Sequence, residues 1–425
     1  MPQVKAQSRI DNVLNFEEAQ RTVLSHANQA RFSQKQIEQV PILDSLGRVL
    51  AQPILADRDF PPFPRATRDG YAVRSEDVGR VPAGLKLAGE IRAGGDFPAG
   101  FTRLGSGEAI SIMTGAPVPG GADAVVMVEY TERAGEHVRV LRPVAAGENV
   151  VPRGSEAKRG SSLVSPGTVI SHPQIALAAS AGKPMINVYS RPRIAILPTG
   201  DEIVPIDAEP AANQIRNSNS FSVAAQVIAS GGDAVQLPIA PDERARLREL
   251  IAQGLESDLL LLSGGVSAGE YDLVEDALAE FGAEFLFTGV QIQPGKPLVF
   301  GRAHPQSNRD RWTYFFGLPG NPISTMVTFQ LFGRLFVRAL AGASASAVTA
   351  RKMRLGKDLK TKTGLTRFLP GKISGAWDDP EVELLSWQGS GDVAAFAGAD
   401  CLLVIPPDRE SFKSGEWMTT IPIEN

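Results

Sequence analysis

Three segments of the chain combine an apolar run, a glycine turn and side chains that carry oxygen atoms. They are Arg193–Glu202, Asp258–Asp272 and Phe315–Pro322. Each apolar run is typical of a buried parallel strand, and open α/β sheets bind ligands at the carboxyl ends of such strands. Bare glycine backbone leaves room for a phosphate, and carboxylate oxygens are hard ligands that suit Mg²⁺. The three strand ends together indicate one phosphate-bearing ligand with a divalent cation.

The turn Ser263-Gly264-Gly265 is the most informative of the three. It follows four consecutive leucines and precedes a segment that opens with a carboxylate. Its backbone N–H groups could approach a phosphate at a helix N-terminus without a clash from side chains. A tight turn between a strand and a helix is the alternative, and the triplet alone does not decide between the two.

The acidic residues near these turns have two interpretations. Asp272 precedes Glu275 by three residues, as in a capping box, and Asp242 stands directly before Glu243, so both are also good helix caps. Glu202 differs because no helical pattern follows it at once. We favour a cation or ligand role for Glu202.

One lysine and two further segments complete the set of candidates. Lys296 lies in a short loop with two prolines and a glycine, which favours an ordered lysine for an oxyanion over a freely solvated surface turn. Asp69 and Thr114 belong to the segments 64–72 and 114–123. On spacing alone these two segments indicate a structural turn and a loop.

Composition argues against several classes of protein. The net charge of −4 argues against general affinity for nucleic acid. No run approaches the roughly 20 apolar residues that cross a bilayer, and the polar N-terminus lacks a signal-peptide pattern, so a cytoplasmic protein without membrane contact is expected. A single cysteine, Cys401, is expected to be an inert core thiol. The four histidines are scattered, which makes oxygen-bound Mg²⁺ a better prediction than zinc.

A scaffold must position these residues, and the sequence predicts a multidomain α/β and β protein. Strand and helix patterns alternate from 193 to 341, which specifies a central doubly wound, mostly parallel sheet with helices on both faces. Its helices are expected to begin near Asn219, Asp242, Asp272 and Asn321. Further helical patterns cover 15–30, 43–50 and 173–182.

The 425 residues favour two to four domains. Changes in the helix and strand patterns and in Gly and Pro content along the chain predict four domains. They are a discontinuous helical linker domain, an inserted β-rich domain, the α/β domain and a small C-terminal β-barrel. The expected bounds are 1–50 with 152–185, then 51–151, 186–345 and 346–425.

Taken together, the segments resemble the MoeA/gephyrin-E family of molybdopterin molybdenumtransferases. Any one of the motifs is weak, but their order and spacing extend the resemblance over roughly residues 10 to 420. The matching pieces are Asp69–Ala72, Thr114–Val126, Pro198–Glu202, Ser263–Ser267 through Asp272, Pro294–Pro297, Gly317–Pro322 and Gln388–Gly391.

The resemblance implies an elongated homodimer in molybdenum cofactor biosynthesis. In the implied reaction, molybdate attacks adenylylated molybdopterin, AMP leaves and the metal enters the dithiolene, assisted by Mg²⁺. Molybdopterin adenylyltransferase and molybdoenzymes or their chaperones would be partners.

The resemblance also implies roles for residues. Glu202, Asp242 and Asp272 would manage the cation and the phosphates, while Asp69 and Thr114 would come from the inserted domain of the partner subunit. Lys296, Pro297, Ser324, Arg367 and Ser390 would form the molybdate pocket. The remaining ligand-binding positions would be Gly200, Asp201, Asn219, Ser263, Gly264, Gly265, Pro319, Gly320 and Asn321.

Two positions depart from the family pattern. Gln293 stands where the family usually has lysine, and Ala66-Thr67-Arg68 stands where it usually has Ser-Ala-Met. We hypothesise a weakened or retuned oxyanion pocket in which Arg68 compensates for the missing cation. The alternatives are a non-catalytic molybdopterin carrier or scaffold, a pterin-nucleotide hydrolase and a paralogue with a different oxyanion preference, such as tungstate.

Overall fold

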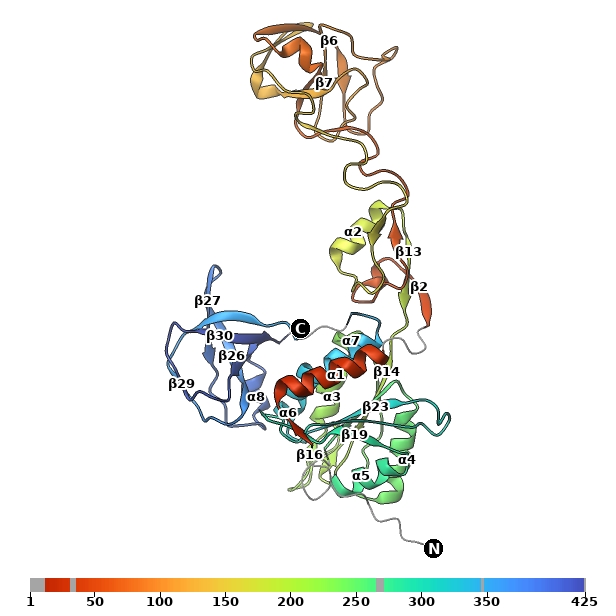
Figure 1. The fold of residues 1–425 in the computed structure, drawn as a ribbon, viewed down its shortest axis with the longest axis vertical. Coiled ribbons are helices and arrows are strands. Elements are labelled where there is room, and N and C mark those ends of the chain that lie inside the picture. Colours follow the sequence, from red (N-terminus) through yellow and green to blue (C-terminus); the bar gives the residue numbers. More distant parts are fainter. Residues whose placement is uncertain (1–11, 31–35, 265–270, 345–347, 424–425) are drawn as a thin grey trace.

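The computed structural model describes residues 12–30, 36–264, 271–344 and 348–423, and for residues 271 and 272 it describes the backbone alone. The molecule is elongated (Figure 1). A β-rich lobe lies at one end and an α/β lobe at the other, with a small lobe between them and a β-barrel beside the α/β lobe. No helix within the described residues is long and apolar enough to cross a membrane.

The α/β lobe is built on a six-stranded sheet, as the alternating pattern predicts. The first four strands in the order below are parallel, and β22 runs antiparallel to both of its neighbours. Side chains of β14 alternate between two cores, which explains why residues 194–197 are all apolar. The strands, in order across the sheet, are β17 (Asp233–Gln236), β14 (Arg193–Pro198), β18 (Leu259–Ser263), β23 (Thr313–Leu318), β22 (Val299–Ala303) and β19 (Glu284–Phe287).

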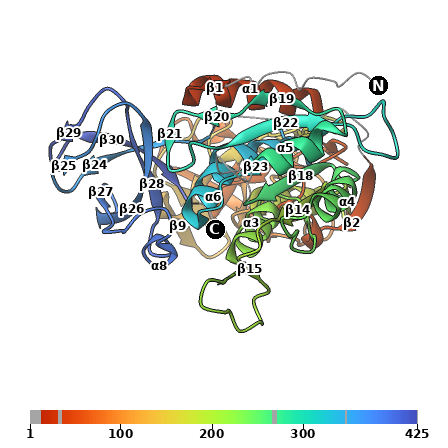
Figure 2. The same cartoon turned by 90° about the horizontal axis from the view of Figure 1, so that it is seen from below.

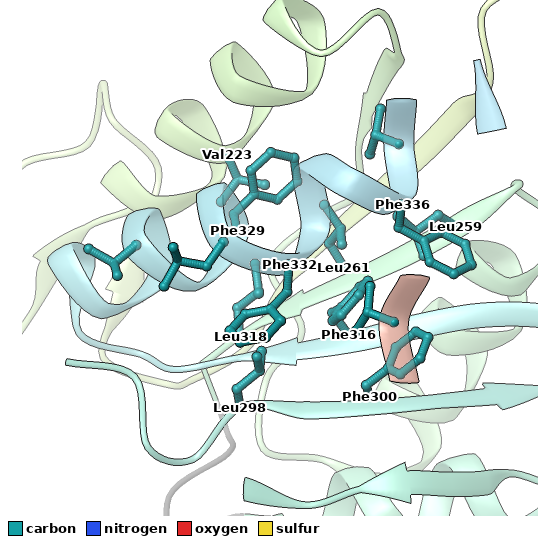
Figure 3. Packing of buried hydrophobic residues seen from close by; sticks show 14 of the residues in the cluster. Val223, Leu259, Leu261, Leu298, Phe300, Phe316, Leu318, Phe329, Phe332 and Phe336 are labelled. Atoms are coloured by element: carbon teal, nitrogen blue, oxygen red, sulfur yellow. The ribbon is translucent and has the colours of Figure 1, made fainter. Parts of the chain in front are cut away.

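Helices cover both faces of this sheet. Figure 3 shows Phe300 and Phe316 of the sheet near Phe329, Phe332 and Phe336 of the covering helix, all without exposed surface. The face with these phenylalanines carries α1 (Phe16–Ala30), α3 (Ser218–Ala229), α6 (Pro322–Thr328), a π-helical turn (Phe329–Gly333) and α7 (Arg334–Leu340). The other face carries α4 (Arg244–Leu255) and α5 (Tyr271–Ala279).

The middle lobe joins chain segments from both sides of the insertion. It holds α2 (His172–Ser180), which starts with a capping box between Ser171 and Gln174. The helix predicted over 43–50 is wrong, because only a 3₁₀ turn, η1 (Leu43–Ser45), forms and Leu50 instead bonds to Thr168. The strand pairs of this lobe are β2 (Ile37–Pro41) with β13 (Met185–Tyr189) and β3 (Ile54–Leu55) with β12 (Ser162–Val164).

The inserted lobe is β-rich, as its Gly- and Pro-punctuated sequence predicts. Gly70 is needed there because a Cβ would overlap the carbonyl oxygen of Val126 on the paired strand. Its six-stranded sheet has the order β8 (Ala124–Met127), β5 (Gly70–Val73), β7 (Glu108–Ile112), β6 (Ala83–Ile91), β10 (His137–Val140) and β9 (Thr131–Ala134). Smaller elements are β4 (Arg65–Ala66) with β11 (Val150–Val151), η2 (Ser75–Val78) and η3 (Val128–Tyr130).

The C-terminal lobe is a closed five-stranded barrel, which agrees with the expected small β-barrel. Its ring consists of β26 (Thr366–Ala376), β27 (Asp379–Leu384), β24 (Arg351–Leu355), β30 (Trp417–Pro422) and β28 (Cys401–Ile405), which returns to β26. The α/β lobe adds β21 (Ile292–Gln293) beside β26. The remaining elements are α8 (Val393–Phe396) and the pairs β25 (Leu359–Lys360) with β29 (Ser411–Phe412), β1 (Val13–Leu14) with β20 (Gly289–Val290), and β15 (Ile203–Val204) with β16 (Ile215–Arg216).

Candidate functional site

The carboxyl ends of three parallel strands meet in register at one edge of the central sheet. Pro198 of β14 pairs with Ser263 of β18, which in turn pairs with Leu318 of β23. The chain reverses its progress across the sheet at β14, because β17 lies on one side of it and β18 on the other. Such a topological switch point leaves a crevice for ligands. The glycine turns singled out in the sequence therefore lie together at this edge.

Close packing explains the glycines at this edge. Gly264 has φ +96°, and an added Cβ would overlap the carbonyl oxygen of Thr199. A Cβ on Gly320 would lie 3.7 Å from the Cα of Gly264, so the second and third turns are neighbours. The glycines are therefore required for the close packing of the three turns against one another at this edge.

Buried polar atoms at the same edge lack hydrogen-bond partners in the described part of the chain. They are Thr199 Oγ1, Ser263 Oγ and Asn219 Oδ1. The Nδ2 of Asn219 donates to the carbonyl of Gly320 at 2.7 Å, which fixes the side chain between α3 and the third turn. Buried polar groups are normally satisfied, so these atoms mark a place for a ligand or solvent.

Thr199 was not among the residues predicted for the site. Only 2% of its surface is exposed. Its position directly after the apolar strand β14 and before Gly200 was the available signal. In this motif the glycine and the acidic residues suggest a ligand site, and Thr199 was interpreted only as part of the turn.

The predicted acidic residues gather beside β14. The backbone N–H of Asp242 donates to Oδ1 of Asp201 at 3.1 Å, and the carboxylate of Glu202 lies close over Gly200. The helix start predicted at Asp242 is wrong: α4 begins at Arg244, and its N-cap is Glu243 without a side-chain cap bond. The bond to Asp201 holds Asp242 outside the helix.

The cation site predicted at this edge is only partly described. Asp201, Glu202 and Asp242 carry carboxylate oxygens of the kind that Mg²⁺ prefers. Within the described residues, no group of three or more His, Cys, Asp and Glu side chains is close enough to form a metal site. Gly265 and the side chain of Asp272 lie outside the described residues.

The residues predicted for the molybdate pocket, here called the oxyanion cluster, lie on segments where the α/β lobe meets the barrel. They are Lys296, Pro297, Ser324, Arg367 and Ser390. The loop of Lys296 and Pro297 packs closely against α6 at Gly295. A Cβ on Gly295 would overlap the Thr328 side chain and lie 3.8 Å from the Ser324 carbonyl oxygen. The carbonyl of Ser390 accepts a bond of 3.0 Å from the N–H of Ile323 on the same helix.

Gln293 joins this cluster through the barrel. Strand β21 pairs Gln293 with Arg367, which is only 8% exposed and donates through Nε to the Lys362 carbonyl at 3.0 Å. Lys296 and Pro297 are exposed, whereas Ser324 and Pro319 are buried. Helix α6 begins directly after Asn321, whose side chain makes no cap bond, and it lies between β23 and the barrel lobe (Figure 2).

Asp69 and Thr114 form a close pair in the inserted lobe. The backbone N–H and the hydroxyl of Thr114 donate to Oδ1 of Asp69 at 2.6 and 2.8 Å. These two bonds hold the pKa of the Asp69 carboxyl below its usual range, and the bond from the backbone N–H has the larger effect. The sheet of this lobe lies at the opposite end of the molecule from β14 and β23 (Figure 1). Within one chain, this pair and the neighbouring Arg68 are remote from the glycine turns.

Cys401 is buried in the barrel. Its side chain has no exposed surface, and burial, with the nearby Asp400 charge, raises the pKa of the thiol to about 11. The prediction of a buried core thiol is confirmed.

Comparison with known proteins decides the family. The MoeA N-terminal region (domains I and II) matches residues 14–182, a probable molybdopterin-binding domain matches 195–339, and the MoeA C-terminal region (domain IV) matches 352–423. The chain belongs to the MoeA family of molybdopterin molybdenumtransferases. Membership assigns it to the transferases of molybdenum cofactor biosynthesis.

Relatives of this MoeA-family chain extend over almost its full length. A molybdopterin molybdenumtransferase from a Nostoc species is 37% identical over 393 residues, which cover 90% of this chain and 88% of that protein. One from Staphylococcus aureus strain Mu50 is 30% identical over 391 residues, with 91% of each covered. A crystal structure of the molybdopterin biosynthesis MoeA protein from Pyrococcus horikoshii has a TM-score of 0.71 at 32% identity, covering 97% of this chain and all of that one.

Proposed function

We propose that this chain inserts molybdenum into the cofactor. Its substrates are adenylylated molybdopterin and molybdate, its leaving product is AMP, and Mg²⁺ assists. The proposal rests on family membership and on the position of the oxyanion cluster next to the glycine turns, with α6 shared between them. The observation that carries it is that α6 begins directly after the third glycine turn and bonds through the N–H of Ile323 to the carbonyl of Ser390.

The two groups of side chains suit different parts of the reaction. Molybdate is a dianion, so carboxylates repel it, whereas a lysine, an arginine and hydroxyls bind it. Lys296, Arg367 and Ser390 supply those groups. The second and third glycine turns would offer backbone N–H groups to the phosphates of the pterin nucleotide.

Mg²⁺ would be held by Glu202, Asp242 and Asp272. When bound, it neutralises phosphate charge and lets an anionic group approach. The residues of this chain position the two substrates and balance their charges, which is sufficient for this substitution because no side chain has to act as the nucleophile.

A homodimer completes the proposal. Asp69 and Thr114 lie in the remote lobe of one chain, and a partner subunit would bring its own pair to the glycine turns. The elongated shape supports this arrangement, since a lobe extended so far from its own α/β lobe is free to reach a second chain (Figure 1). Arg68 would arrive with the same lobe.

A non-catalytic carrier is the second candidate. The observation that favours it is Gln293, a neutral side chain on β21 next to Arg367, where the family resemblance implies a lysine. A carrier would bind adenylylated molybdopterin but would release no AMP on addition of molybdate.

The charge of Lys296 tests the proposal. AMP release is measured against molybdate concentration for wild type, for Lys296→Gln and for Lys183→Gln, which removes an exposed lysine in the middle lobe. We expect the concentration for half-maximal release to rise about tenfold or more in Lys296→Gln, since a charge-assisted hydrogen bond to the anion is lost. The Lys183 variant should match wild type. Equal molybdate dependence in all three proteins would reject the oxyanion role.

A further inference from the structure

A narrow connection joins the inserted lobe to the middle lobe (Figure 1). Two chain segments form it, 56–61 on the way out and 153–161 on the way back, and they are here called the neck. Backbone hydrogen bonds tie the two segments together at Ala56 and again at Phe60. Lobes joined by so little chain move relative to one another unless a contact fixes the connection. The neck therefore determines the direction in which the inserted lobe points.

The carboxylate of Asp59 lies between these two levels and bridges the returning segment. Its Oδ2 accepts from Nε of Arg153 at 2.9 Å, and its Oδ1 accepts from the backbone N–H of Arg159 at 3.1 Å. Arg153 follows β11 of the inserted lobe, whereas Arg159 precedes β12 of the middle lobe. One side chain of the outgoing segment therefore holds both ends of the returning segment, and this contact is here called the neck bridge.

The surroundings of Asp59 strengthen the neck bridge. The Asp59 side chain is only 19% exposed, although it lies in a thin part of the molecule. Gly154 has φ +67°, and a Cβ there would lie 2.6 Å from Nζ of Lys158 and 3.2 Å from Cγ of Asp59. The glycine thus allows the lysine and the carboxylate to pack against the backbone. Exposed ion pairs contribute little, but a sheltered carboxylate with charge-assisted bonds holds its geometry better.

The proposed function makes the direction of this lobe important. Asp69 and Thr114 lie beyond the neck, and the proposed homodimer requires them to reach the glycine turns of a partner subunit. A displacement of about 1 Å at a reacting group can cost about a hundredfold in rate. A small change of angle at the neck is amplified along the lobe, because the lobe extends far from its point of attachment (Figure 1).

We propose that Asp59 is a positioning residue for the pair of Asp69 and Thr114. The neck bridge fixes the direction of the inserted lobe, so that the pair reaches the partner's site in a reactive orientation. The inference rests on the proposed function, which gives the lobe its task in that site. Asp59 itself touches no substrate. Its loss therefore slows the reaction without weakening molybdate binding, since the oxyanion cluster belongs to other lobes.

The direction of the lobe is measured first, as the distance between two spin labels in the full-length protein. Lys86→Cys in the inserted lobe and Lys183→Cys in the middle lobe provide exposed labelling sites, while Cys401 is buried. Exchange with an excess of unlabelled chain leaves most labelled dimers with labels on one subunit only. We expect a narrow distance distribution in wild type and one at least about twofold broader in Asp59→Asn. Equal widths would overturn the proposal.

Asp358→Asn is the matched control. Asp358 also accepts from one side-chain cation, Lys413 Nζ at 2.8 Å, and from one backbone N–H, that of Ser414 at 2.9 Å, but it lies in the barrel. This variant should keep the narrow distribution of wild type, because it removes the same kind of contact outside the neck. A broadening equal to that of Asp59→Asn would show that the effect is not specific to the neck and would reject the proposal.

Arg153→Gln tests the neck bridge from its other side. Arg153 is 64% exposed, so its replacement should leave the fold intact. The variant should broaden the distribution as well. Combination with Asp59→Asn should add little, because both changes open the same contact. Fully additive broadening in the double variant would show that the two residues act separately and would reject the bridge.

Kinetics then connect the direction of the lobe with the reaction. With saturating substrates, Asp59→Asn should release AMP about tenfold more slowly than wild type, while the molybdate concentration for half-maximal release stays unchanged. Partial unfolding would instead lower the fraction of active protein, which a single-turnover amplitude measures. Asp358→Asn should match wild type in both parameters. Wild-type turnover in an Asp59→Asn protein whose distance distribution is broader would reject the positioning role.

Failure of the positioning role and failure of the proposed function are distinguishable. If wild type releases AMP in response to molybdate but Asp59→Asn keeps the narrow distribution or the wild-type turnover, the positioning role is wrong and the function stands. If Asp59→Asn broadens the distribution but wild type releases no AMP from adenylylated molybdopterin, the function is wrong. The positioning role then falls with it, while the neck bridge remains a contact that orients the lobe.

Discussion

At the scale of single residues, the pair of Asp69 and Thr114 sets the charge of one carboxylate. Two bonds from Thr114 depress its pKa, so Asp69 stays ionised to a lower pH than a free aspartate. Any contribution of the ionised form is therefore complete above the ordinary carboxyl pKa, about 3.9, and is lost as the pH falls through the depressed value.

Removal of one of these bonds should move the titration upward. Thr114→Val deletes the hydroxyl but keeps the backbone N–H, so the pKa of Asp69 should rise toward the ordinary value while remaining below it. Thr114→Ser keeps both donors and serves as the control. Carbon NMR of the Asp69 carboxyl across an acid titration gives the pKa directly. A Thr114→Val protein that titrates like wild type would show that the hydroxyl is not a donor.

Gln293 carries the second prediction at this scale. Gln293→Lys adds a cation beside Arg367 and the loop of Lys296. We expect half-maximal AMP release at a molybdate concentration several-fold lower than in wild type, with a stronger dependence on salt. Gln39→Lys makes the same change of charge on β2 in the middle lobe and should have no effect. An unchanged molybdate requirement in Gln293→Lys would reject a retuned oxyanion pocket.

At the scale of elements, the turn after β18 depends on glycine. Gly264→Ala would force a Cβ onto the Thr199 carbonyl at a positive φ, which costs about 1–3 kcal/mol of folding free energy. Gly84→Ala on β6 is the control, since an added Cβ there meets nothing within 4 Å. Urea unfolding of both variants measures the difference. Two equally stable proteins would mean that the turn does not have the close packing described.

The sequence predicts elements well where local chemistry is decisive. Residues 194–197 of β14 and 259–262 of β18 are all apolar because both faces of the sheet are covered, and this pattern identifies the two strands without a structure. Prediction from local sequence fails where a hydrogen bond to a residue distant in the chain determines the local structure instead. Asp242 is a good cap by composition, but its N–H bonds to Asp201 and α4 begins two residues later. Residues 43–50 have helical spacing, but Leu50 pairs with a segment more than a hundred residues away.

The oxyanion cluster shows the same limit. Its members, from Lys296 to Ser390, are separated by other elements, and the resemblance, not the local pattern, groups them. The bond between Ile323 and Ser390 and the pairing of Gln293 with Arg367 bring them together. Thr199 had no local signal beyond its neighbours in the chain, since burial without a partner is a property of the folded state.

At the scale of the whole molecule, the distance between lobes makes a prediction about subunits. If each site combines the Asp69 lobe of one chain with the Lys296 lobe of another, Asp69→Asn and Lys296→Gln should each lose most activity alone when molybdate is kept well below the concentration that half-saturates Lys296→Gln. Mixed dimers of the two variants would contain one intact site of two. After subunit exchange at equal concentrations, about a quarter of wild-type activity should return.

Subunit exchange supplies its own control. The double variant Asp69→Asn with Lys296→Gln, mixed with either single variant, has no intact site in any dimer and should remain inactive. If mixed dimers are detected by mass spectrometry but no activity returns in the first mixture, both residues belong to a site formed within one chain.

AMP release from adenylylated molybdopterin is the most direct test of the central claim. Wild-type protein is loaded with the adenylylated pterin and Mg²⁺, and AMP and pterin-bound molybdenum are quantified in a single turnover with and without molybdate. The account predicts that AMP appears only when molybdate is present, in a 1:1 ratio to inserted molybdenum. Retention of the substrate without AMP release would make the protein a carrier, and equal release without molybdate would make it a hydrolase; either result would contradict the account.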